Sequence, residues 1–340
     1  MSSARTLRIG TRGSALAMWQ ARHVESLIRA QPEAPPVELV RIKTEGDVRT
    51  DVPLWQVGGR AFFTKEIDKA LLSNEVDVAV HSLKDLSTVL EPGIELAAAL
   101  TREDPSDALV SRNGVRLAEL GRGARIGTSS LRRRAFLARA RPDATLLELR
   151  GNVPTRIERL ERGEYDAIVL AAAGLRRLGL EKHISERLPA DVFPPAVSQG
   201  AIGVCVRTDD AEASRWLRRL DDPASRLATT AERALLRTIE GGCQVPLGAL
   251  GTLRDNVLHL QAAVCALDGS TLLRSQAELA ASLINATRLG EQVAQDLLSQ
   301  GAAKLMAEER ERAKVTPFVS GPEAPQASSG NELWRRVEEP

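Results

Sequence analysis

The chain has 340 residues, and its 46 Lys and Arg against 45 Asp and Glu give a formal net charge of +1. Hydrophobic residues make up 43% of it, which is enough apolar material for roughly two to three packed domains. The near-zero net charge excludes a disordered polyelectrolyte, no apolar run approaches the ~20 residues that span a bilayer, and residues 1–20 lack a secretory signal. An odd set of three cysteines does not form a disulfide scaffold. The composition predicts a soluble protein of the reducing cytoplasm.

Strand-like and helix-like runs alternate in the N-terminal third of the chain. The expected order is strand 7–11, helix 14–30, strand 37–44, helix 64–74 and strand 76–80. Apolar residues recur at helical spacing in the helices, whereas the strands are short apolar runs. This β-α-β-α-β order predicts a mainly parallel sheet covered by helices.

The same order restarts in the middle of the chain. The sequence Arg-Ile-Gly-Thr occurs at 8–11 and again at 125–128, and each copy is followed by a serine and a helix-like run. Further strands are expected at 146–149 and 166–170, around a helix at 155–162. Two similar α/β lobes that face each other would line a cleft with helix N-termini, which attract anions.

After the second lobe, the strand-like run at 201–206 is expected to return to the first lobe. A helix at 224–240, strands near 258–267 and a helix at 282–314 then predict a small α+β domain. The predicted division is a discontinuous first lobe of residues 1–103 and 198–220, a second lobe of 104–197, a C-terminal domain of 221–315 and a disordered tail of 316–340.

Arginine is strongly preferred over lysine, since 7 of the 46 cationic residues are lysines and 46 − 7 = 39 are arginines. The most concentrated stretch, Gly121–Arg141, holds seven arginines and no acidic residue. This stretch is either a solvated basic helix face or an anion site. The hydroxyls of residues 128–130 supply a helix N-cap within it, so that guanidiniums, hydroxyls and free amides converge. That convergence favours an anionic ligand.

Nucleic acid is the competing anion for this stretch. Base stacking requires aromatic side chains within the basic surface, and Phe136 is the single aromatic residue of Gly121–Arg141. With a net charge of +1, the chain is also not expected to present a broad positive surface to nucleic acid. A small polycarboxylate or phosphate ligand is therefore favoured over nucleic acid.

A second candidate site is the polar turn His81-Ser82-Leu83-Lys84-Asp85, directly after a predicted strand. Ends of strands are where α/β proteins place ligand-binding groups. Asp85 is either a helix N-cap or a general acid/base with Lys84 as its neighbouring cation. We interpret His81 as a core histidine.

The first lobe repeats the pairing of an arginine with a capping serine. Arg12 lies on the turn and Ser14 at the start of the predicted helix, in the place that Ser130 holds in the second lobe. This arrangement fits either ligand binding or ordinary capping with an exposed arginine.

The three cysteines differ in their surroundings. Cys205 and Cys265 lie in small apolar strands and are expected to be core residues. Cys243 lies in the loop Glu240–Pro246, flanked by glycines that let the backbone approach a ligand. It is either a tethering or nucleophilic thiol or merely an exposed cysteine. With four histidines in the chain and no evident partner for Cys243, a protease or metal site is disfavoured.

Taken together, these segments resemble the porphobilinogen deaminase (hydroxymethylbilane synthase) family. Seven motifs occur in the family's order over roughly residues 5 to 310. They are residues 8–14 with Trp19-Gln20, 81–85, 127–133, 149–152, 173–179, 199–201 and 240–246.

The resemblance implies two lobes like those of type 2 periplasmic binding proteins and a third domain that bears a cysteine. In this family that cysteine carries a dipyrromethane cofactor through a thioether. Four porphobilinogen molecules are added stepwise with loss of ammonia, and water releases the linear tetrapyrrole hydroxymethylbilane. Because each porphobilinogen carries an acetate and a propionate, such a ligand fits an arginine-rich cleft.

The resemblance also assigns residues. Asp85 would be the catalytic carboxylate and Cys243 the attachment point of the cofactor. The residues expected to bind the cofactor are Lys84, Ser130, Arg132, Arg133 and Arg156. Those expected to bind the substrate are Arg12, Ser14, Gln20, Phe63, Arg150, Arg177 and Gln199.

The chain departs from the family pattern at Ser87, where proline is usual, and at Ser198 and Ala61, where glycine is usual. None of these changes removes a chemical group. We expect a monomeric cytoplasmic enzyme that binds porphobilinogen and requires no metal, nucleic acid or membrane. The rival hypothesis is a non-catalytic two-lobe protein that binds anions.

Overall fold

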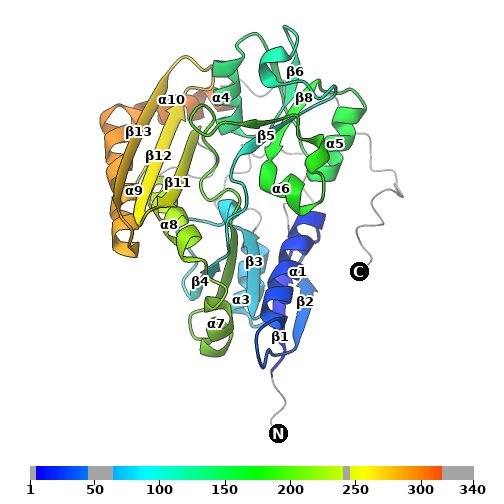
Figure 1. The fold of residues 1–340 in the computed structure, drawn as a ribbon, viewed down its shortest axis with the longest axis vertical. Helices are drawn as coiled ribbons and strands as arrows, with labels where there is room; N and C mark the ends of the chain where they lie inside the picture. The colour runs from blue at the N-terminus through cyan, green and yellow to red at the C-terminus, as the bar shows by residue number, and fades with distance from the viewer. Residues whose placement is uncertain (1–4, 45–63, 240–245, 316–340) are drawn as a thin grey trace.

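The computed structural model describes residues 5–44, 64–239 and 246–315. They form two α/β lobes, each built on a five-stranded sheet, and a smaller domain with a three-stranded sheet. The first lobe lies at the lower end of Figure 1, and the other two units lie side by side above it. The predicted class of two α/β lobes and one α+β domain is confirmed.

The first sheet is mainly parallel and contains one reversed strand, β10. Its strands pair in the order β2 (Val37–Arg41), β1 (Leu7–Thr11), β3 (Val78–Ser82), β10 (Ile202–Arg207) and β4 (Ile94–Ala99). β1 runs parallel to β2 and β3, whereas β10 runs antiparallel to β3 and β4. Since β10 is antiparallel to both of its neighbours, β4 runs in the same direction as β2, β1 and β3. The prediction of a mainly parallel sheet is therefore confirmed, and the one reversed strand, β10, is where the chain re-enters the sheet after it has formed the second lobe.

Helices cover both faces of the first sheet. α1 (Ala15–Arg29) and α7 (Ala211–Arg218) share one apolar cluster with Val78 and Val80 of β3. α3 (Lys65–Leu72) packs on the other face, in the cluster that contains Ala79. The split follows from the alternation of side chains along a strand.

The second sheet repeats this plan. Its strand order is β7 (Thr145–Leu147), β6 (Arg125–Gly127), β8 (Ala167–Ala171), β5 (Asp107–Ser111) and β9 (Glu186–Leu188). β6 runs parallel to β7 and β8, and β5 runs antiparallel to β8 and β9. The order β7-β6-β8 thus matches β2-β1-β3, so the repeat predicted from the Arg-Ile-Gly-Thr echo is confirmed.

The repeated glycine of that echo has the same steric cause in both lobes. A Cβ atom on Gly10 would lie 3.0 Å from the Val76 side chain, and one on Gly127 would lie 2.8 Å from the Tyr165 ring. The Gly127 distance is shorter than real Cβ contacts and the Gly10 distance is at the limit, so both strands favour glycine where the neighbouring side chain crosses them.

Three helices connect the strands of the second lobe. They are α4 (Leu131–Ala140), α5 (Val153–Glu161) and α6 (Ala172–Arg177). Two of them start at polar caps, because Ser130 accepts a hydrogen bond from Arg133 N and Asn152 accepts one from Thr155 N. α6 follows β8 without an intervening loop. This brings the residues at the end of α6 next to the first lobe.

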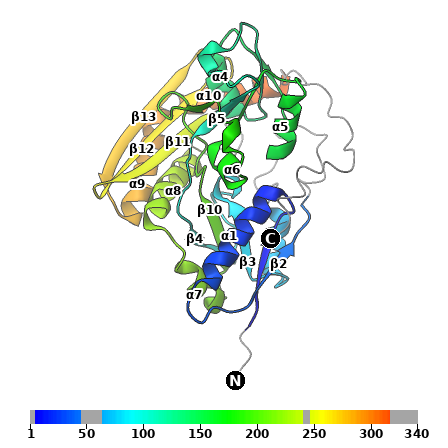
Figure 2. The ribbon, with the colours of Figure 1, turned by 45° about the vertical axis from the view of Figure 1, so that its right-hand side comes forward.

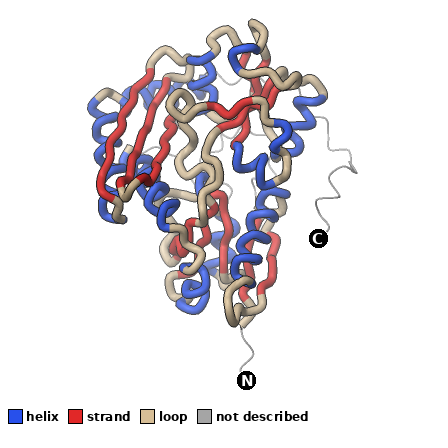
Figure 3. Tube along the Cα trace, viewed as in Figure 1, coloured by secondary structure: helices blue, strands red, loops and turns tan. Residues whose placement is uncertain are grey.

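The third unit is an antiparallel sheet of β11 (Leu247–Arg254), β12 (Val257–Cys265) and β13 (Leu272–Ala280) with helices packed on it (Figure 3). These helices are α8 (Pro223–Thr238), α9 (Leu283–Ser299) and α10 (Ala302–Val315). The predicted single helix at 282–314 is wrong: it divides after Ser299, where Gly301 adopts φ +99°. A positive φ is open to glycine and ends the first helix there.

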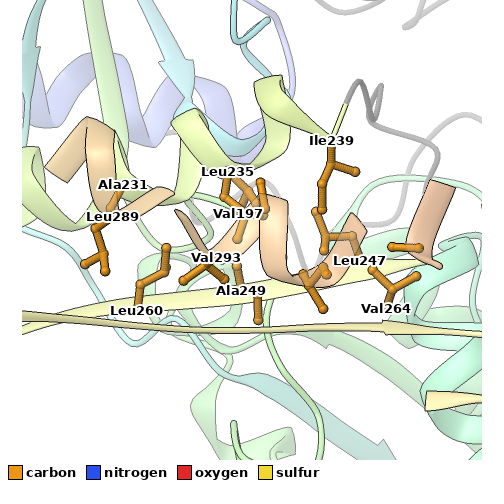
Figure 4. Packing of buried hydrophobic residues seen from close by; sticks show 14 of the residues in the cluster. Val197, Ala231, Leu235, Ile239, Leu247, Ala249, Leu260, Val264, Leu289 and Val293 are labelled. Atoms are coloured by element: carbon orange, nitrogen blue, oxygen red, sulfur yellow. The ribbon is translucent and has the colours of Figure 1, made fainter. Parts of the chain in front are cut away.

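Val197, from the segment that returns to the first lobe, packs with α8, α9 and β11 in the core of the third unit (Figure 4). A buried ion pair joins the same regions. Glu232 of α8 accepts hydrogen bonds from Arg102 Nη1 at 2.6 Å, Ser198 N at 2.6 Å and Gly251 N at 2.7 Å. One carboxylate therefore ties α8 and β11 to both segments that cross between the lobes.

Candidate functional site

Two helix N-termini are built in the same way in the two lobes. Ser14 Oγ accepts a hydrogen bond from Ala17 N at 3.4 Å, and Ser130 Oγ accepts one from Arg133 N at 3.4 Å. Both serines are therefore caps, as their position before each helix predicts. Capping satisfies part of each helix terminus and leaves further amides of the first turn for a ligand.

Asp85 ends a short 3-10 turn, Leu83–Asp85, that continues β3. The turn is held by Leu83 N, which donates to Ala201 O at 3.0 Å. Asp85 is half-buried, and its carboxylate accepts no hydrogen bond from the described part of the chain. The alternative that Asp85 caps a helix is wrong, because Ser82 occupies the cap position of this turn.

Gln20 fixes the strand end that precedes this turn. Its side chain is 2% exposed, and its Nε2 donates to Ser82 Oγ at 2.9 Å. The predicted substrate-binding residue Gln20 thus holds the backbone that carries Lys84 and Asp85.

A buried polar network leads from Lys84 to the second lobe. Lys84 Nζ donates to Gln199 Oε1 at 3.2 Å, and Gln199 Nε2 donates to Asp107 Oδ1 at 3.0 Å. Asp107 pairs in turn with Arg132 Nη1 at 2.7 Å and with Arg133 Nη2 at 2.6 Å. These five residues, together with Asp85, are called the interlobe site below.

The electrostatics of the interlobe site follow from burial and from this pairing. Burial alone would raise the pKa of Asp107, but the Arg132 and Arg133 cations outweigh it and hold that pKa well below its usual range. Burial lowers the pKa of Lys84 to about 8, although the Asp85 carboxylate opposes the shift. Lys84 is therefore a cation at neutral pH that loses its charge in mild alkali.

Further cations surround this network. Burial and the neighbouring charges of Arg133 and Arg150 lower the pKa of Arg156 to about 10. Its Nε donates to Gly151 O at 2.7 Å. Arg177 Nη2 donates to Gly200 O at 2.6 Å, and burial lowers the pKa of Arg177 to about 10. Buried cations that lie close to other cations favour an anionic ligand at this site.

Most of the arginines in residues 121–141 form ion pairs or hydrogen bonds within the protein. Arg125 pairs with Asp166 at 3.0 Å, and Arg141 pairs with Asp143 at 2.8 Å. Arg139 Nη1 donates to Gly269 O at 3.0 Å. The stretch is therefore not a solvated basic face, and this alternative is wrong for Arg132 and Arg133, which are 4% and 7% exposed.

Cys205 and Cys265 are buried, as expected of core residues. Burial raises the pKa of the Cys205 thiol to about 12 and that of Cys265 to about 11, so neither forms a thiolate at neutral pH. His81 is also a buried residue, and burial lowers its pKa to about 4 with a contribution from the Arg12 charge. The predicted site residues Cys243 and Phe63 lie outside the described residues.

The residues missed by sequence reasoning are the acids that organise the cations. Asp107 is fully buried at the start of β5, and Glu232 is fully buried on α8. Asp107 begins an apolar strand and Glu232 lies in the middle of a helix, so neither position names a partner from the sequence alone. Ser198, one of the positions where the resemblance leads us to expect glycine, adopts φ +63°, the left-handed region that glycine occupies without strain.

Comparison with known proteins assigns this arrangement to a family. Residues 7–215 match "Porphobilinogen deaminase, dipyromethane cofactor binding domain", and residues 226–299 match "Porphobilinogen deaminase, C-terminal domain". The chain belongs to the porphobilinogen deaminase family. The porphobilinogen deaminases of Syntrophobacter fumaroxidans and Syntrophomonas wolfei are 47% and 46% identical to it, covering 89% and 90% of this chain and 98% and 99% of theirs. The family predicted from the seven motifs is thus confirmed.

Among solved structures, the BvgS VFT2 domain of Bordetella pertussis superposes on the chain with a TM-score of 0.36 at 13% identity. The superposition covers 63% of this chain and 86% of that one. The two-lobe class of this chain rests on the strand order of its own two sheets.

The donor set of the interlobe site fits dipyrromethane, the cofactor that the family match names. Lys84 is influenced by the charges of Arg132 and Arg133, and Arg156 by the charge of Arg133, whereas Asp107 offsets one of these positive charges. The surplus of positive charge suits a ligand with several carboxylates. In the described ranges, no group of three His, Cys, Asp or Glu could hold a metal, and no helix is long and apolar enough to cross a membrane.

Proposed function

We propose that the interlobe site performs the porphobilinogen deaminase reaction with Asp85 as its catalytic carboxylate. As a family member, the chain is a transferase that condenses four porphobilinogen molecules into hydroxymethylbilane with loss of ammonia. The observation that carries the assignment is the Asp85 carboxylate, which is free of hydrogen bonds to the described chain and lies beside Lys84.

Asp85 suits each charge change of the reaction. Loss of the amine from porphobilinogen leaves an electron-poor carbon, and a fixed carboxylate stabilises the positive charge that develops there. The same oxygens can assist the departing amine and accept the proton that the newly joined ring releases. A neutral amide could do none of these things, so the proposal requires a carboxylate at this position.

The cations divide between cofactor and substrate. When bound, dipyrromethane supplies the pyrrole to which the first substrate ring is joined. We assign its anchor to Cys243 and its carboxylates to Lys84, Ser130, Arg132, Arg133 and Arg156. We assign the substrate to Arg12, Ser14, Arg150, Arg177 and Phe63, with Gln20 and Gln199 acting through Ser82 and Lys84, which they hold.

We further propose that the enzyme works as a cytoplasmic monomer, without nucleic acid or membrane, and that its lobes divide at 103/104 and 197/198. The internal pairing of Arg125, Arg132, Arg133 and Arg141 supports the absence of a nucleic-acid surface. Native mass spectrometry would report the oligomeric state. Salt-sensitive binding of RNA at micromolar protein would contradict this part of the proposal.

The test of the function is the intact mass of the purified protein, followed by peptide mapping. We expect a two-pyrrole adduct on the peptide that contains Cys243, and Cys243→Ser should lack it. Cys205→Ser and Cys265→Ser are matched controls and should keep the adduct, because both thiols are buried. A chain that stays unmodified after incubation with porphobilinogen would favour the rival hypothesis of a non-catalytic anion-binding protein.

A further inference from the structure

Arg177 is held by a contact between the two lobes. It lies at the end of α6, and its guanidinium carbon is 5.7 Å from the centre of the Trp19 ring of α1 in the first lobe. Figures 1 and 2 both show α6 against the end of α1. Within this distance a guanidinium is attracted to the face of an indole.

A second anchor fixes the same guanidinium. Its Nη2 donates to Gly200 O at 2.6 Å, on the segment that returns to the first lobe. Gly200 lies close against the other crossing segment, since a Cβ there would lie 2.3 Å from Glu103 O, and Glu103 N donates to Gly200 O at 3.1 Å. Trp19 and Gly200 therefore restrain Arg177 from two different parts of the chain.

The Trp19 ring is supported in turn by His23, one turn further along α1. The two rings are stacked at 5.1 Å with an angle of 18° between their planes. Burial and the Arg177 charge lower the pKa of His23, so its imidazole is neutral at pH 7 and does not repel Arg177. The stack gives the indole a defined orientation on the helix.

We propose that Trp19 is a positioning residue that pre-orders Arg177 for a carboxylate of porphobilinogen; this rests on the proposed role of Arg177 in binding the substrate. A free arginine must give up several rotamers when it binds a ligand. Because Trp19 and Gly200 already fix the guanidinium, porphobilinogen meets an ordered cation. Trp19 therefore sets the affinity for substrate and leaves the chemistry at Asp85 unchanged.

The test is the steady-state kinetics of the dipyrromethane-loaded enzyme. Trp19→Leu removes the aromatic face and should raise the KM for porphobilinogen about 3- to 10-fold, the range that an exposed to partly buried cation–π contact provides, with kcat within about 2-fold. Trp19→Phe keeps a weaker face and should give an intermediate KM. This graded series remains informative if the leucine variant does not fold.

The matched control is Trp216→Leu. Trp216 lies near Arg215 and Arg219, with guanidinium carbons at 5.2 and 5.0 Å from its ring centre, and belongs to the core of the first lobe. This variant should lower stability without a change in KM. An equal rise of KM in both tryptophan variants would show a general structural effect and would overturn the proposal.

A double-mutant cycle separates this inference from the function on which it rests. Arg177→Ala should raise KM, and adding Trp19→Leu to it should raise KM no further. If Arg177→Ala leaves KM unchanged, the role of Arg177 in substrate binding is wrong and the proposal fails with it. If the two effects multiply, Arg177 binds substrate but Trp19 does not act through it, and only the positioning role is overturned.

Discussion

Asp107 offers the sharpest test of how this protein keeps its buried cations in place. The side chain is fully buried and is the shared partner of Arg132 at 2.7 Å and of Arg133 at 2.6 Å. Asp107→Asn keeps the shape and removes the charge. Two guanidiniums, 4% and 7% exposed, would then lie in a low-dielectric interior without a counter-charge.

The size of the effect can be worked from these contacts. Breaking a buried ion pair by removing one partner costs about 3–5 kcal/mol. Asparagine still accepts one hydrogen bond, from Gln199 or Arg133, which offsets about 1 kcal/mol. We therefore expect the free energy of unfolding to fall by about 3 kcal/mol, measured by urea denaturation with the m-value as a check on the two-state assumption.

The pH dependence of the difference has a definite sign. Because the pKa of Asp107 is lower in the folded protein, its stabilisation is present above the ordinary pKa of about 3.9 and is lost as the pH falls below that value. The difference in free energy of unfolding between the wild type and Asp107→Asn should thus be constant from pH 6 to pH 8 and become smaller below about pH 4. Asp143→Asn, an exposed partner of Arg141, is the control and should leave stability unchanged. A loss below about 1 kcal/mol for Asp107→Asn would refute the reasoning.

Three other changes test the site and its scaffold. Asp85→Asn should lower kcat by orders of magnitude while the unfolding curve and the cofactor adduct stay as in wild type, and near-normal turnover would remove Asp85 from the mechanism. Since the pKa of Lys84 is about 8, its charge is present below pH 8 and lost above it. Because Lys84 is assigned to the carboxylates of the cofactor, kcat/KM should fall between pH 7 and pH 9.5, and Lys84→Arg should flatten that fall; an unchanged profile in the variant would contradict the assignment. Ser198→Gly should raise the free energy of unfolding by about 1 kcal/mol, seen as a higher urea midpoint, because it relieves a left-handed backbone; a lower midpoint would mean that the serine is not strained.

The sequence predicts those parts of the fold whose signal is local. The segments 7–11 and 125–127 are found as strands, and Ser14 and Ser130 are found as caps, because periodicity and capping chemistry act within a few residues. The reversed direction of β10 depends on where the chain returns to the first lobe, which is decided by tertiary packing. The break at Gly301 lies inside an otherwise helical pattern, where one glycine is an ambiguous signal.

The candidate site shows the same division. Asp85 and Lys84 are found from the motif, and so is the concentration of arginines, but the partners of those arginines are not. Asp107 precedes Arg132 by 25 residues along the chain, and only the packing of β5 against α4 and β8 brings them together. The sequence shows that a charged residue in an apolar segment needs a partner of opposite charge. Which residue becomes that partner depends on how the chain folds.

The arginines of this enzyme fall into groups that the sequence alone would treat as one. Arg125 and Arg141 pair with surface acids and stabilise local structure, while Arg102 is held by the buried Glu232 between the crossing segments. Arg156 and Arg177 instead donate to backbone carbonyls, and no carboxylate of the described chain pairs with either. A carbonyl orients a guanidinium but does not cancel its charge. These two arginines therefore stay attractive to the carboxylates of porphobilinogen, so the site's affinity depends on which arginines lack an internal acid rather than on their total number.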